Sequence, residues 1–128
     1  AYMGTRFIAT KEANADAAYK QMLVDTSADD IVYSNLFTGV HGNYLKPSIQ
    51  KAGMDPNNLP EGDKSTMKIG SGGSSKTKAW RDIWGAGQGV GSIGAITSTA
   101  EAVSKLEQEY ASARARMQAI ASPYGEQA

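Results

Sequence analysis

The chain begins with the stretch AYMGTRFIAT, residues 1–10, in which Tyr, Met, Phe and Ile surround a Gly-Thr pair. This composition predicts a short buried strand over residues 1–9 that breaks into a turn at Gly4-Thr5. Glycine lets a ligand approach the backbone closely, and the threonine hydroxyl adds a hydrogen-bond donor. The turn is therefore a candidate anion site, although a plain strand end is the commoner meaning of a Gly-Thr pair.

The spacing of apolar residues predicts the next elements. A helix is expected over residues 12–25, with its N-cap between residues 10 and 14. Further predicted elements are a strand at 31–33, an extended piece at 37–40, and a helix over 42–53 with Pro47 in its first turn and Gly53 at its end. Residues 55–77 are rich in Gly, Ser, Pro and Asn, which predicts a mobile surface segment.

The clearest helical signal lies near the C-terminus. Ser98 and Glu101 have the spacing of a capping box, and the helix that follows should run to about Ala121. Its apolar stripe has spacings of three and four residues, as an amphipathic helix requires. The stripe consists of Ala100, Val103, Leu106, Tyr110, Ala113, Met117 and Ile120.

A glycine-dense stretch precedes this helix and contains Gly85, Gly87, Gly89, Gly91 and Gly94. Residues 89–94 match GxGxxG formally, but they do not join a buried strand to a helix, so a dinucleotide site is rejected. The stretch either approaches a flat ligand closely or packs against other backbone. Gln88 is the one side chain of residues 87–91 that can hydrogen-bond, and it is the candidate ligand contact.

Composition excludes several functional classes. The 128 residues fit one domain, and 13 basic and 13 acidic residues leave no net charge to attract nucleic acid. The absence of cysteine excludes disulfides, a thiol nucleophile and a Cys-based zinc site. No apolar run approaches the ~20 residues of a membrane helix, so a cytoplasmic protein is expected. His41, the sole histidine, lacks an identifiable partner, which favours a structural or solvated role over general-base catalysis.

Three segments, in this order, resemble the nitronate monooxygenase (2-nitropropane dioxygenase-like) family. The first segment is Tyr2-Met3-Gly4-Thr5-Arg6-Phe7-Ile8-Ala9-Thr10. The second segment runs from Phe37-Thr38-Gly39-Val40 to Asn43-Tyr44-Leu45. The third segment is Trp84-Gly85-Ala86-Gly87-Gln88-Gly89-Val90-Gly91.

The resemblance implies a TIM (β/α)₈-barrel enzyme that binds FMN without a covalent bond and oxidises alkyl nitronates with O₂. The family's Met-Gly-Thr segment helps bind the FMN phosphate, and its Ala-Gly-Gln loop closes over the active site. The cofactor-binding residues implied are Tyr2, Met3, Gly4, Thr5, Gly87 and Gln88. The opening turn and the glycine-rich loop should therefore meet at one flavin. The family's catalytic histidine belongs to a Gly-Gly-His motif that this sequence lacks, so no catalytic residue is assigned here.

A complete (β/α)₈ barrel needs roughly 200 residues. With 128 residues and no initiator Met at position 1, the chain is expected to be a C-terminal fragment of an α/β barrel. Residues 1–9 would be the last barrel strand, 10–78 a helical substrate-domain extension, and 79–128 the active-site loop and a terminal helix that packs on the barrel. Such a fragment should be mostly helical, inactive alone and a poor binder of FMN.

Two alternatives stay open. Enoyl-acyl-carrier-protein reductases and NAD(P)H:quinone reductases share the barrel and FMN, and these residues do not separate them from nitronate monooxygenases. A small helical interaction module without a cofactor is the alternative from another class. The amphipathic helix that ends near Ala121 and the balanced charge favour such a module.

Overall fold

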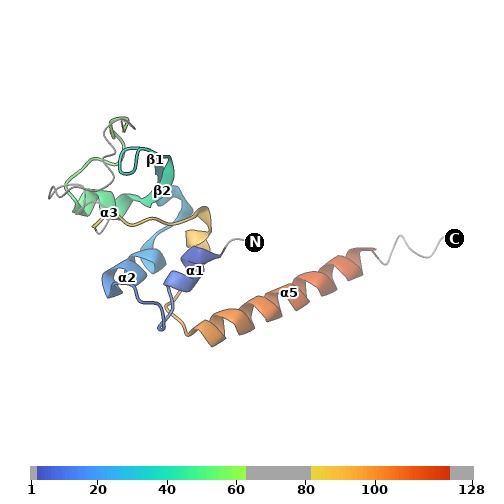
Figure 1. Cartoon of the computed structure of the whole chain (residues 1–128). Helices are drawn as coiled ribbons and strands as arrows, with labels where there is room; N and C mark the ends of the chain where they lie inside the picture. Colours follow the sequence, from blue (N-terminus) through green and yellow to red (C-terminus); the bar gives the residue numbers. More distant parts are fainter. Residues whose placement is uncertain (1–2, 63–81, 122–128) are drawn as a thin grey trace.

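A computed structural model describes residues 3–62 and 82–121. Its elements are α1 (Gly4–Ile8), α2 (Ala17–Asp25), the 3₁₀ helix η1 (Ala28–Asp30), β1 (Ile31–Ser34), β2 (Gly42–Leu45), α3 (Lys46–Lys51), the 3₁₀ helix η3 (Gln88–Ser92) and α5 (Thr99–Ala121). The described residues are thus mostly helical, with one two-stranded sheet. Figure 1 shows the earlier elements gathered into a body from which α5 extends.

The opening segment is helical, and the strand predicted over residues 1–9 is wrong for its described part. Residues Gly4–Ile8 form α1, while Tyr2 lies outside the described residues. The Phe7 N–H donates to the Met3 carbonyl at 3.3 Å, and the Thr10 hydroxyl donates to the Phe7 carbonyl at 2.8 Å. Local hydrogen bonds of this kind hold the segment as a helix. A short apolar run cannot be assigned to strand or helix from its pattern alone.

Helix α2 begins later than predicted. Its N-cap is Asp16, whose carboxylate accepts the Ala18 N–H at 2.7 Å, so the helix starts at Ala17 and not near residue 12. An aspartate in this position satisfies a backbone donor that the first turn leaves unpaired. The helix ends at Asp25, as predicted, and directs the fully buried Leu23 into the core.

The two strands form an antiparallel pair whose register runs from Ile31 opposite Leu45 to Ser34 opposite Gly42. Strand β1 confirms the strand predicted at residues 31–33. The extended piece predicted at 37–40 is wrong, because the chain turns there through Gly39, whose φ is 74°. The helix predicted over 42–53 is shorter, since residues 42–45 pair as β2.

The second half of that predicted helix is confirmed. Helix α3 covers Lys46–Lys51 with Pro47 in its first turn, where a missing N–H costs nothing. Gly53 follows with a φ of 83°, the left-handed conformation that favours glycine at a helix end.

The glycine-rich segment runs beside β2. Tyr44 and Gly85 form an isolated antiparallel bridge, the Leu45 N–H donates to the Trp84 carbonyl at 2.9 Å, and the Ala86 N–H donates to the Asn43 carbonyl at 3.3 Å. This segment therefore packs backbone against backbone at its start. The buried core beneath it consists of Ala9, Leu23, Leu45, Ala86, Val90 and Ile93.

Helix α5 begins at the predicted capping box. The Glu101 carboxylate accepts the Ser98 N–H at 2.7 Å and the Ser98 hydroxyl at 2.8 Å, while that hydroxyl accepts the Glu101 N–H at 3.1 Å. The helix ends at Ala121, as predicted. Its apolar stripe is largely exposed beyond the first turns. Among the helices described, none combines the length and apolar character needed to cross a membrane.

Candidate functional site

The opening helix and the glycine-rich loop meet at one hydrogen bond. The half-buried Thr5 hydroxyl accepts the Gly87 N–H at 2.9 Å, across 82 positions of sequence. Gly87 is also the N-cap of η3, and its carbonyl accepts the Val90 N–H at 3.1 Å. This bond therefore places Gly4 and Thr5, the first two residues of α1, beside Gly87 and Gln88, so that four of the six predicted cofactor-binding residues lie together.

The side chain of Arg6 links α1 to the segment that precedes α5. Its guanidinium donates to the Ala9 carbonyl at 3.1 Å, to the Ala95 carbonyl at 3.3 Å and to the Thr97 hydroxyl. Thr97 also pairs with Thr10 in a parallel bridge. The charge of the Arg6 guanidinium alone would suit a phosphate or an ion pair. In the described part of the chain it instead cross-links two backbone segments.

The N-terminus of α1 presents unused donors. Met3, its N-cap, makes no side-chain capping bond, and Gly4 is exposed with nothing within 4 Å of the place a Cβ would take. Within residues 3–62 and 82–121, no protein acceptor takes the backbone N–H of Gly4 or the hydroxyl proton of Thr5. Unpaired N–H groups at a helix start carry partial positive charge. These groups fit a phosphate oxygen.

Gln88 follows the bonded Gly87 directly and is exposed. Its side-chain amide has no hydrogen-bond partner among the residues described, and a Cβ on the neighbouring Gly89 would meet nothing within 4 Å. An amide can both donate and accept. Open space and a free amide together leave this side of the loop accessible to a ligand.

Trp84 anchors the start of the loop. Its backbone N–H donates to the buried Ser48 hydroxyl at 3.0 Å, and its ring stacks on Tyr19 with centroids 5.0 Å apart. The Lys51 ammonium lies 5.3 Å from the same ring. The Tyr19 hydroxyl donates to the Gly85 carbonyl, and burial raises the pKa of Tyr19. Sequence reasoning missed Tyr19 and Ser48, because nothing local in the sequence marks contacts to a tryptophan so distant.

His41 lies in the connection between β1 and β2, where its ring stacks on Tyr33 with centroids 4.7 Å apart. Both side chains are exposed. This stacked, exposed position agrees with a structural or solvated role. Among the described residues, no three His, Cys, Asp or Glu side chains are grouped so that they could hold a metal ion.

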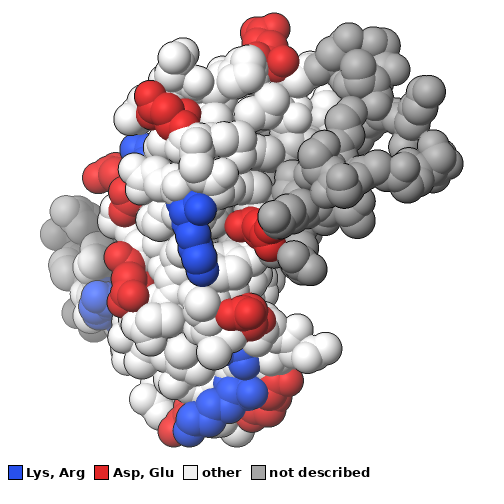
Figure 2. Space-filling model, turned by 90° about the vertical axis from the view of Figure 1, so that its left-hand side faces the viewer, with Lys and Arg blue, Asp and Glu red and all other residues white. Residues whose placement is uncertain are grey.

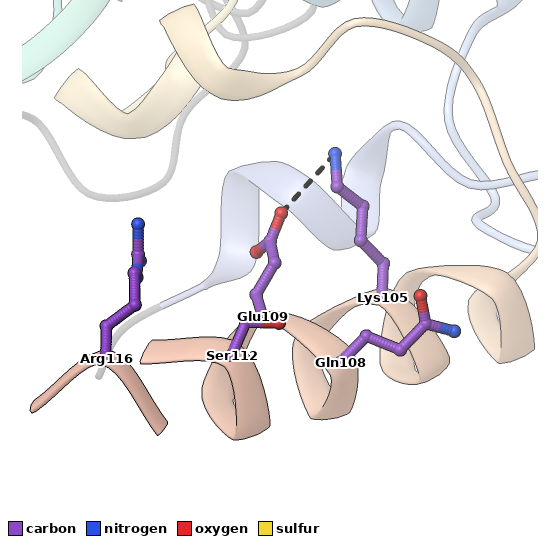
Figure 3. A pocket seen from close by; sticks show the side chains of 5 residues that line it. All are labelled: Lys105, Gln108, Glu109, Ser112 and Arg116. Carbon is purple, nitrogen blue, oxygen red and sulfur yellow. Dashed lines mark ion pairs between the residues drawn. The ribbon is translucent and has the colours of Figure 1, made fainter. Parts of the chain in front are cut away.

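A hollow of about 440 Å³ lies along α5 and does not include the predicted site residues. It is lined by Lys105, Gln108, Glu109, Ser112 and Arg116. Figure 3 shows Lys105, Glu109 and Arg116 projecting from α5 toward the side on which α1 lies. The hollow is lined by residues of α5 alone and does not include the junction at Gly87.

Charge is mixed across the surface. Figure 2 shows basic and acidic side chains interspersed on one face of the described molecule, in keeping with 13 residues of each sign in the sequence. No field of a single sign covers that face.

Comparison with known proteins identifies the family. A family model described as nitronate monooxygenase matches residues 1–109, which include all three segments of the resemblance and the Thr5–Gly87 junction. No curated protein and no solved structure matches the chain. The family resemblance is thereby confirmed. The chain belongs to the nitronate monooxygenase family, a family of oxidoreductases that generally depend on a flavin.

Proposed function

We propose that this chain forms part of the FMN site of a (β/α)₈-barrel enzyme that oxidises alkyl nitronates with O₂. The hydrogen bond between Thr5 and Gly87 is the observation that carries the proposal. It joins the two segments that the family would place at one flavin. The barrel, the cofactor and the substrate come from the family and are parts of the proposal.

The phosphate of FMN would bind at the start of α1. The Gly4 N–H and the Thr5 hydroxyl proton are donors without protein acceptors among the described residues. Because the Thr5 oxygen already accepts the Gly87 N–H, its remaining proton is directed away from that bond. A glycine at position 4 leaves room for a phosphate to approach the backbone. Met3 would contribute from the preceding residue, and Tyr2, which the family resemblance also implies, lies outside the described residues.

A bound flavin would supply the redox chemistry that couples oxidation of the carbanion-like substrate to reduction of oxygen. The residues of this chain would orient the flavin and the substrate and enclose them. Gln88 has a free amide that can donate to or accept from a ring or a substrate, and Gly87 and Gly89 permit close approach. His41 is not assigned the proton-removing role, since it stacks on Tyr33 at the surface.

An NMR titration tests the site at weak affinity. Backbone amide shifts of the chain would be followed while FMN, or riboflavin as the matched ligand without phosphate, is added. We expect FMN to move the amides of Gly4, Thr5, Gly87 and Gln88, and riboflavin to move mainly the last two. Amides of α3 serve as the internal control. FMN shifts confined to other regions would contradict the proposed site, and tight stoichiometric binding would contradict the expected weak affinity.

Substrate choice is tested by oxygen uptake in the FMN-loaded whole enzyme of which this chain would form part, with an alkyl nitronate compared against NADH. Uptake driven by the nitronate alone supports nitronate oxidation. Oxidation of NADH would instead support an enoyl-acyl-carrier-protein or quinone reductase. The 128-residue chain by itself is expected to show no turnover above free FMN, because it lacks the Gly-Gly-His motif that carries the family's base.

A further inference from the structure

Helix α5 carries a heptad pattern that its own body leaves largely uncovered. Val103, Tyr110 and Met117 are seven residues apart, and so are Leu106, Ala113 and Ile120. Apolar residues alternating at spacings of three and four form the seam of a coiled coil. Val103 is 42% exposed, Tyr110 71%, Met117 68% and Ile120 66%. An apolar seam exposed to this degree indicates a surface that another element covers.

We propose that α5 pairs in antiparallel orientation with α5 of a second copy of this chain. The charges beside the seam support this partner. Glu107 and Glu109 lie in the first half of the seam, and Arg114 and Arg116 in the second half. With Val103 opposite Ile120 of the second copy, Glu107 faces Arg114 and Glu109 faces Arg116. Two-fold symmetry doubles these to four pairs of opposite charge.

The sizes of the seam residues favour the same orientation. In this register Val103 meets Ile120, Leu106 meets Met117, and Tyr110 meets Ala113 of the second copy. The large aromatic ring thus faces the smallest seam residue. A parallel pair would set Tyr110 against Tyr110 and Ala113 against Ala113. The seam would then have an overpacked layer at the tyrosines next to a cavity at the alanines. A parallel pair would also retain only the Glu109–Arg114 charge pairs.

The shape of the molecule agrees with antiparallel pairing. Figure 1 shows α5 extending away from the body, so an antiparallel pair sets the two bodies at opposite ends of the helices. A parallel pair would bring both bodies to one end. Within one chain Glu109 pairs with Lys105 at 3.6 Å, but both side chains are more than 60% exposed. Such a surface pair contributes little, so Glu109 can switch partner at small cost.

Most of the proposed surface lies beyond the residues that the family model matches. The family model matches residues 1–109, whereas Arg114, Arg116, Met117 and Ile120 lie beyond the match. Four of the six seam residues and both arginines therefore lie beyond the matched residues. The pairing is independent of the FMN site, which lies at the other end of the sequence near Thr5.

Sedimentation velocity of the whole chain over a range of concentrations tests the proposal. We expect a reversible monomer–dimer equilibrium. The double variant Glu107→Arg/Glu109→Arg should raise the dissociation constant by at least about tenfold, because like charges then meet across the seam. The double variant Arg114→Glu/Arg116→Glu should do the same. An equimolar mixture of the two variants should restore dimers as heterodimers.

Two further variants test which face of α5 forms the dimer and whether the two helices are antiparallel. Gln108→Arg adds the same charge on the side of α5 opposite the seam and should leave the dissociation constant unchanged. Glu107→Arg alone should weaken an antiparallel pair, where Glu107 faces an arginine, and spare a parallel one. Far-UV circular dichroism checks that each variant keeps its helix. A dimer that the double variants leave intact, or a chain that is monomeric at every concentration, would overturn the proposal. The second result would leave the barrel as the partner of α5.

Discussion

The Thr5 hydroxyl oxygen lies 2.9 Å from the backbone nitrogen of Gly87 and accepts its N–H. This bond joins α1 to the first residue of the glycine-rich loop, although 82 positions separate them. Under the proposed function it also sets how far the phosphate donors at the start of α1 lie from Gln88. One hydroxyl thus contributes to stability and to the geometry of the site, and the two contributions can be measured separately.

Replacing Thr5 by valine should weaken the fold. The substitution keeps the β-branched shape but leaves the half-buried Gly87 N–H without its acceptor, which costs roughly 1–3 kcal/mol in the free energy of unfolding. Urea denaturation followed by circular dichroism measures the change. Thr5→Ser is the matched control, because it retains the hydroxyl. Equal stability of the valine and serine variants would show that the bond adds nothing measurable.

Adding a methyl group at Gly87 should separate ligand binding from folding. The Gly87 φ is −79°, which any residue can adopt, and a Cβ would lie 3.6 Å from the Thr5 hydroxyl oxygen, an ordinary contact. Gly87→Ala should therefore unfold at nearly the wild-type urea concentration. If a flavin approaches this backbone closely, the same variant should lose the FMN-induced shift at Gln88. An unchanged FMN titration would show that no ligand comes near this position.

Removing the Tyr19 hydroxyl should loosen the start of the loop. Tyr19→Phe retains the stack on Trp84 but loses the hydrogen bond to the Gly85 carbonyl, for a cost of about 0.5–1.5 kcal/mol. Tyr19→Leu should cost more, because it removes the ring contact as well. The free energy of unfolding from urea titration ranks the three proteins. A leucine variant as stable as the phenylalanine variant would show that the stack contributes nothing.

Local signals predicted some elements well and others poorly. Ser98 and Glu101 predicted the start of α5, and Gly53 predicted the end of α3, because capping chemistry acts within a few residues. Strand β2 could not be predicted, since its residues are extended only through pairing with β1 and the segment around Gly85. Apolar residues of α1 suited a strand equally well, and local hydrogen bonds decided for helix.

The sequence indicated which residues make up the candidate site, but it did not indicate the hydrogen bond that joins them. Family motifs pointed to Gly4, Thr5, Gly87 and Gln88 and implied that they would meet. That Thr5 would accept from Gly87 depends on how α1 packs on η3, which no short stretch encodes. The same holds for Arg6, whose charge suggested an anion or a carboxylate. Its guanidinium binds carbonyls instead, because folding brings the Ala95 backbone within reach.

The attachment of α5 should depend on acidic pH through two glutamates. Hydrogen bonds from the backbone and hydroxyl of Ser98 hold the pKa of Glu101 below its ordinary 4.5. Backbone hydrogen bonds, its own and that of Thr99, lower the pKa of Glu12, whose carboxylate accepts the Thr99 N–H at 2.9 Å. A carboxyl whose pKa is lower in the folded state stabilises that state above its unfolded pKa. This contribution is lost as the pH falls from about 4.5 through the folded pKa values.

Urea denaturation between neutral pH and mild acid should therefore show a declining free energy of unfolding. Glu101→Gln keeps an oxygen that can accept from Ser98 but cannot titrate, so its profile should be flatter than that of the wild type. Ser98→Ala removes the cap itself and should cost about 1 kcal/mol at neutral pH. Glu61→Gln, at an exposed position outside α5, is the matched control and should follow the wild-type profile. A glutamine variant with the full acid-dependent loss would contradict the role assigned to the Glu101 carboxylate.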